Sequence, residues 1–101
     1  MINKNILFGI FLIIVSISVL GINTSLHENA HKQIDLYNGC ESAIITYGFW
    51  GGSTQEINCV ANENRAILNT QNEIIGYNIS SIIYALLLCT LIIGITIINK
   101  N

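Results

Sequence analysis

The sequence predicts a mainly α-helical membrane protein with two transmembrane helices and a small extracytoplasmic α+β region between them. Half of the 101 residues (51%) are hydrophobic and only 10% are charged, and residues 6–22 and 76–98 contain no charged residue at all. As helices these two stretches would be about 26 and 34 Å long, close to the roughly 30 Å hydrocarbon core of a bilayer. All six acidic residues lie between them.

This distribution divides the chain into three parts. Residues 1–22 form the first transmembrane helix, residues 23–75 form the extracytoplasmic region, and residues 76–101 form the second transmembrane helix with a short cytoplasmic tail. Lys4 and Lys100 flank the two apolar stretches on their terminal sides. Because positive charges favour the cytoplasmic side, we expect a protein integral to the cell membrane with both termini in the cytoplasm.

The first apolar stretch has a second interpretation, a cleavable signal peptide. Lys4, the apolar residues after it and the small residue Gly21 fit such a signal, with cleavage after Gly21. The stretch exceeds the usual apolar core of 7–15 residues, which favours an uncleaved helix. Both interpretations place residues 23–75 outside the cell.

The only two histidines of the chain form the pattern His27-Glu28-Asn29-Ala30-His31. On a helix, positions i and i+4 lie one turn apart on one face, so both imidazoles can reach one metal ion. The pattern resembles the H-E-x-x-H signature of zinc-dependent hydrolases of the zincin type. The resemblance implies that His27 and His31 bind Zn²⁺ and that Glu28 is the catalytic base acting on water. The alternative is an ordinary solvated helix face.

Glu73 is the best candidate for the third zinc ligand. Asn72-Glu73 resembles the N-E element that gluzincins place on a second helix, where the glutamate binds zinc. If both helices project straight out of the bilayer, Glu73 stands about 4–5 Å above the membrane edge and the two histidines about 7–14 Å above it. Asn69 and Asn72 share the face of Glu73 and are expected to donate hydrogen bonds around the ligands. Asp35 is the second choice for the ligand, or a carboxylate that orients one.

Between the two helices the sequence predicts a β-hairpin. The first helix should end at Asn38-Gly39, a typical C-terminal stop. Residues 42–50 are strand-like, residues 51–54 (Gly-Gly-Ser-Thr) are typical of a turn, and residues 55–61 fit a returning strand. Asn62 is expected to cap the second helix, which then continues into the second apolar stretch.

The cysteines predict one disulfide. Cys40 and Cys59 flank the expected hairpin in an oxidising compartment, so we expect them to be bonded. The alternatives are two free thiols or zinc ligation by the cysteines themselves, and the second is disfavoured because neither cysteine belongs to a C-x-x-C pair. Cys89 lies deep in the second apolar stretch and is expected to be a small packing residue.

These observations predict a small integral membrane protein with a zinc site. The H-E-x-x-H resemblance implies a zinc-dependent metallopeptidase that cleaves a peptide or a membrane protein at the membrane surface. The alternatives are a non-catalytic structural or interaction protein of the membrane and a holin-like hairpin. The net charge of −2 argues against a nucleic-acid partner, because the chain offers no basic patch to neutralise phosphates.

Overall fold

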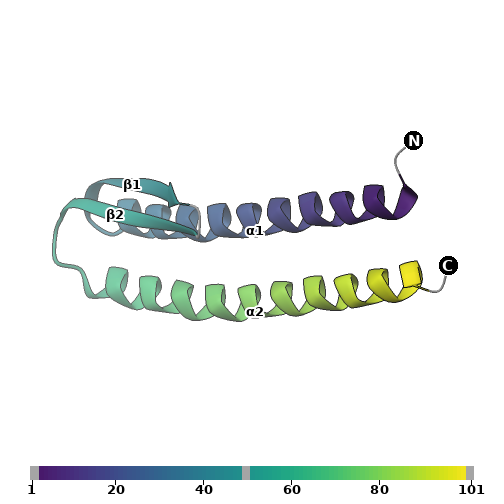
Figure 1. Ribbon diagram of the computed structural model, residues 1–101. Coiled ribbons are helices and arrows are strands. Elements are labelled where there is room, and N and C mark those ends of the chain that lie inside the picture. The colour runs from purple at the N-terminus through teal and green to yellow at the C-terminus, as the bar shows by residue number, and fades with distance from the viewer. Residues whose placement is uncertain (1–2, 49–50, 100–101) are drawn as a thin grey trace.

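The computed structural model describes residues 3–48 and 51–99, which form a long helical hairpin with a small β-hairpin at its closed end (Figure 1). The element order is α1 (Lys4–Tyr37), β1 (Cys40–Gly48), β2 (Gly51–Cys59) and α2 (Glu63–Asn99). The molecule measures 61 × 25 × 16 Å, and the start of α1 and the end of α2 lie side by side at the open end (Figure 1). The expected mainly helical fold with a two-stranded hairpin is confirmed. Lys100, one of the two lysines from which the orientation is predicted, lies outside the described residues.

Helix α1 carries both the first apolar stretch and the H-E-x-x-H pattern without a break. It contains 34 residues and is therefore about 50 Å long. The side chain of Asn3 caps its start by accepting a hydrogen bond from the backbone N–H of Asn5. The helix ends at Tyr37, and Gly39 follows with φ of +97°, a conformation that favours glycine. The expected stop at Asn38-Gly39 is confirmed.

The two strands pair in antiparallel register, with Gly48 opposite Gly51 and Cys40 opposite Cys59. The turn expected at residues 51–54 is wrong, because these residues are the first four of β2. Gly52 lies against helix α1 instead: a Cβ built on it would be 3.0 Å from Cγ of Glu28. Here glycine marks a close approach between a strand and a side chain, which a sequence cannot distinguish from a turn.

Covalent and polar bonds fasten the base of the β-hairpin. The expected disulfide between Cys40 and Cys59 is confirmed, and Cys89 is not bonded. Arg65, in the first turn of α2, pairs through Nε with Glu56 of β2 at 3.1 Å. The same guanidinium donates through Nη1 to the backbone oxygens of Asn38 (3.1 Å) and Val60 (2.6 Å). The hairpin is thus fixed to the ends of both helices.

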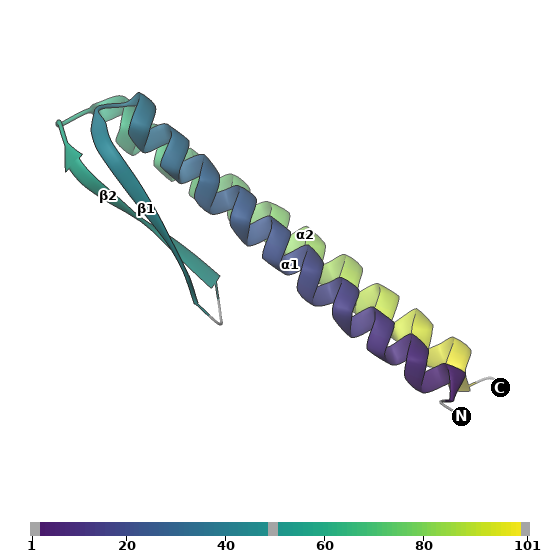
Figure 2. The same cartoon turned by 90° about the horizontal axis from the view of Figure 1, so that it is seen from above.

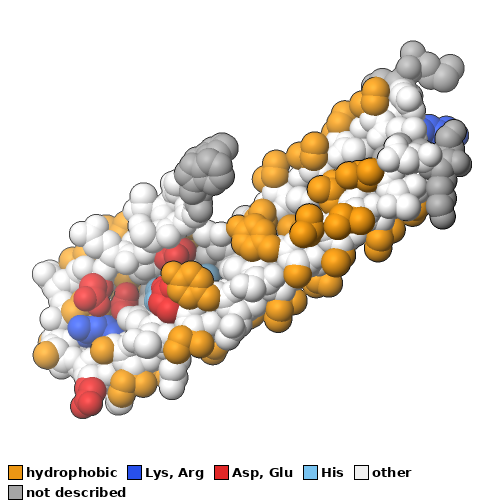
Figure 3. Space-filling view, turned by 60° about the horizontal axis from the view of Figure 1, so that its bottom comes forward, with side chains coloured by type: hydrophobic (Ala, Val, Ile, Leu, Met, Phe, Trp, Pro, Cys, Tyr) orange, Lys and Arg blue, Asp and Glu red, His pale blue; other side chains and the backbone are white. Residues whose placement is uncertain are grey.

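Helix α2 begins after Asn62, whose side chain accepts a hydrogen bond from the backbone N–H of Arg65 at 3.2 Å, as expected of a cap. It lies antiparallel beside α1, while the β-hairpin lies beside the half of α1 at the closed end (Figures 1 and 2). Both helices are long and apolar enough to cross a membrane. Among the described residues, the only buried hydrophobic ones are Cys40 and Ala43. Apolar side chains instead cover the outside of the helices away from the hairpin (Figure 3).

Candidate metal centre

A seam of polar contacts joins α1 to α2 beside the β-hairpin. On α1 it uses four residues spaced by four, which lie along one face of the helix: Asn23, His27, His31 and Asp35. Asn23 donates to the hydroxyl of Ser80 at 3.0 Å at the end of the seam nearest the apolar half. The seam brings both histidines of the H-E-x-x-H pattern to the interface with α2.

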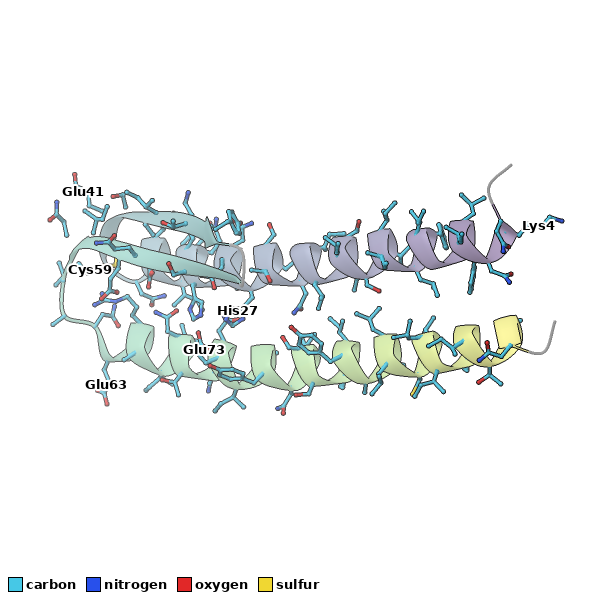
Figure 4. All side chains as sticks on the ribbon, in the orientation of Figure 1. Lys4, His27, Glu41, Cys59, Glu63 and Glu73 are labelled. Carbon is cyan, nitrogen blue, oxygen red and sulfur yellow. A yellow bond between two sulfur atoms is a disulfide. The ribbon has the colours of Figure 1, made fainter. Side chains whose placement is uncertain are left out.

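Three side-chain atoms converge in this seam: Nε2 of His27, Nε2 of His31 and Oε1 of Glu73. The two nitrogens are 3.2 Å apart, and Glu73 Oε1 lies 3.3 Å from His27 Nε2 and 2.6 Å from His31 Nε2. Figure 4 shows His27 and Glu73 pointing toward each other from facing helices. Ligands of a tetrahedral zinc ion, about 2.0–2.1 Å from the metal, are about 3.3 Å apart. Two of the three separations match this value, and the third requires a small outward movement of one side chain.

The charge balance of the cluster suits a cation. Burial disfavours protonation of His31, but its hydrogen bonds to Asn69 and Glu73 and the negative charges of Glu73 and Glu28 outweigh burial and raise its pKa above 6.5. For Glu73, burial acts in the opposite direction, but the hydrogen bonds and charges of the two histidines hold its pKa below 4.5.

Asn69 orients the ring of His31 and connects it to a buried carboxylate. Its Nδ2 donates to Oδ1 of Asp35 at 2.9 Å, and its Oδ1 lies 2.7 Å from Nδ1 of His31. Because the amide nitrogen donates to Asp35, the amide oxygen faces the histidine and accepts, so His31 Nδ1 carries the hydrogen. In the neutral ring, Nε2 then presents its lone pair to the cluster. Asp35 is only 4% exposed.

The remaining two sequence candidates lie beside the cluster. Asn72 donates to the backbone oxygen of His27 at 3.2 Å and so touches the motif helix rather than a ring. Glu28 is 6% exposed, and its Oε2 accepts a hydrogen bond from Oγ1 of Thr54 on β2 at 2.6 Å. No sequence signal marks Thr54, because its position opposite Glu28 depends on how the β-hairpin folds back along α1.

Two cavities lie on either side of the cluster, between β2 and α2. One, of about 550 Å³, lies toward the closed end of the molecule, and the other, of about 450 Å³, lies toward the apolar half. Both are lined by Glu28, Gly52 and Glu73. The acidic and histidine side chains of this region are gathered around a hollow at the hairpin end (Figure 3). A ligand in either cavity would therefore lie against both carboxylates.

No family model, curated protein or solved structure matches this chain. The function of the protein must therefore be inferred from the geometry of the cluster and from the H-E-x-x-H resemblance.

Proposed function

We propose that this protein is an integral membrane zinc hydrolase that cleaves peptide bonds at the membrane surface. The observation that carries the proposal is the convergence of one carboxylate oxygen and two imidazole nitrogens, from Glu73, His27 and His31, on one point between the helices. Two histidines and a glutamate are a ligand set found in catalytic zinc sites, which keep a fourth position open.

The surface of the helices supports the location in a membrane. Large apolar side chains along both helices are exposed, with Ile13 at 61% and Ile17 at 67%. A chain with so small a core would gain too little from apolar burial in water to offset the entropy of folding. Hydroxyls in the apolar halves donate to carbonyls four residues earlier in their own helix, as in Ser16 and Thr90, which suits a medium without water. Lys4 favours cytoplasmic termini, with the β-hairpin outside.

Different residues of the chain would carry out different parts of the hydrolysis. His27, His31 and Glu73 would hold zinc, and Asn69 keeps His31 in the tautomer that leaves Nε2 available. When bound, zinc supplies the Lewis acidity that activates water and polarises a carbonyl. Glu28 accepts the proton of the attacking water, and Thr54 fixes the carboxylate by bonding one of its two oxygens.

The cavities beside the cluster support a polypeptide substrate. Strand β2 is one edge of a two-stranded sheet, and its residues Gly52 and Thr54 line the larger cavity. An extended segment can add to a free strand edge through backbone hydrogen bonds. A peptide, or the segment of a membrane protein just outside the bilayer, would lie there beside Glu28.

A second candidate function is a non-catalytic zinc clamp that joins the two helices. It is favoured by the position of Glu28, which is almost fully buried and already hydrogen-bonded to Thr54. In that case zinc would serve to fix the helix pair for interaction with another membrane protein.

Metal analysis and one isosteric variant separate these functions. Wild-type protein purified in detergent should carry about one zinc per chain, and His27→Ala should abolish binding. Glu28→Gln should keep the zinc and lose hydrolysis of a fluorogenic peptide library, while Glu63→Gln, a matched change at an exposed position, should keep both. Zinc without hydrolysis in the wild type would favour the clamp. Wild-type protein that binds no zinc would contradict both functions and leave the simple membrane hairpin.

A further inference from the structure

Gly76 on α2 lies directly against the imidazole of His27. A Cβ built on Gly76 would be 2.3 Å from Nδ1 and 2.4 Å from Cε1 of this ring. Both distances are far inside van der Waals contact, so the ring occupies the space that any other residue at this position would fill. Gly76 is also one of the residues that line the smaller cavity.

We propose that Gly76 is a positioning residue: because it has no side chain, it leaves the space in which the imidazole of His27 lies as a metal ligand. It follows Glu73 by three residues and therefore shares its helix face. With no side chain at Gly76, the ring of His27 can lie against the backbone of α2, which leaves its Nε2 3.3 Å from Glu73 Oε1 and 3.2 Å from His31 Nε2. This role rests on the proposed metal site and adds to it a residue that contributes no ligand atom.

A substitution at Gly76 should affect the site rather than the fold. The colliding atoms belong to the end of a flexible side chain, so the ring of His27 can swing away without a shift of either backbone. Alanine also has a higher helix propensity than glycine, so the substitution should not destabilise α2. Gly76→Ala should therefore fold normally with His27 displaced from the cluster.

Other glycines of the helices provide controls. A Cβ on Gly9 or Gly21 would meet no atom within 4 Å. Gly21 lies in α1 six residues before His27, about 9 Å away along the helix axis, so Gly21→Ala makes the same chemical change away from the cluster and without a collision. If glycine mattered only through helix flexibility, the two substitutions would act alike.

The test measures zinc affinity by chelator competition on detergent-purified full-length protein. Gly76→Ala should bind zinc at least about 100-fold more weakly than wild type. Loss of a residue that supports a metal ligand usually weakens binding by about 10- to 100-fold, and here a ligand itself is displaced. Gly21→Ala should match the wild type. Circular dichroism and the retained disulfide report that the variants fold.

A second measurement requires no metal. Imidazole NMR signals of the metal-free protein should shift for His27 in Gly76→Ala, with a smaller change for His31. Wild-type affinity in Gly76→Ala, or an equal loss of affinity in Gly21→Ala, would overturn the inference. If the wild type binds no zinc, the proposed function fails, and unchanged His27 signals in Gly76→Ala would then overturn the positioning role separately.

Discussion

Replacing Asn69 with alanine should weaken zinc binding without removing any ligand. The amide accepts from His31 Nδ1 at 2.7 Å and donates to Asp35 Oδ1 at 2.9 Å, and Asn69→Ala deletes both bonds. Removal of such a supporting partner of a metal-bound histidine usually costs about 10- to 100-fold in affinity, or about 1.4–2.7 kcal/mol. We expect a value in this range, because His31 has no other hydrogen bond at Nδ1 among the described residues.

The same substitution should also destabilise the fold, for a separable reason. Asp35 is 4% exposed and would lose the donor that compensates its burial. An unsatisfied buried acceptor costs about 1–3 kcal/mol in the free energy of unfolding. Adding Asp35→Asn to Asn69→Ala removes the unpaired charge, so the double variant should recover part of this stability but none of the zinc affinity.

The assay is a chelator competition for zinc, combined with thermal unfolding of the same samples. Asn72→Ala is the matched control, because Asn72 bonds the backbone oxygen of His27 at 3.2 Å and no imidazole. Its effect on zinc affinity should be less than about tenfold, below the range for a residue that supports a ligand. Unchanged affinity in Asn69→Ala, or an equal loss in Asn72→Ala, would refute the role assigned to Asn69.

Three further predictions concern the disulfide, the pH dependence and the topology. Non-reducing mass analysis should find Cys40 joined to Cys59 and Cys89 alkylated; reduction should lower the free energy of unfolding by about 3 kcal/mol in the chain-entropy model for a loop of this size. In the metal-free protein, the raised pKa of His31 contributes stability that is lost as pH rises through that pKa. The lowered pKa of Glu73 contributes stability that is lost as pH falls through that pKa. The thermal unfolding temperature should therefore be highest at a pH between the two pKa values. Zinc competes with protons, so the stabilisation that it adds should instead grow as pH rises through the histidine range. Tags at either terminus of spheroplast-embedded protein should resist external protease, and a digested amino-terminal tag would contradict the proposed orientation.

The parts of the structure that local signals determine could be predicted from the sequence. The stop of α1 at Asn38-Gly39 and the cap of α2 at Asn62 follow from residues whose preferences act within one turn. The convergence of Glu73 with the histidines also follows from the expectation that two antiparallel helices leave one membrane surface and would then share a common reference height. The first two features need only the preferences of single residues, and the third needs only distances along a helix axis.

The parts that depend on which surfaces meet could not be predicted. Gly52 fits a turn as well as a strand until its contact with Glu28 is known. The hydrogen bond from Thr54 to Glu28 and the close approach of the His27 ring to Gly76 likewise arise only because elements distant in the sequence meet. The sequence signal at Gly76 is an isolated glycine in a helical pattern, and the same pattern also occurs where a helix ends or packs closely against a neighbour.

The small size of the chain is compatible with the proposed zinc site because of how the candidate ligands are held. All three come from two helices of 34 and 37 residues, whose register is fixed over a length far greater than the site itself. The disulfide and Arg65 then fix the hairpin that brings Thr54 to Glu28, so few additional residues are needed. In the proposed setting, lipid around the apolar halves replaces the hydrophobic core that a soluble hydrolase would have to build. The helix pair therefore has to be packed well only along its polar seam, where the candidate ligands lie.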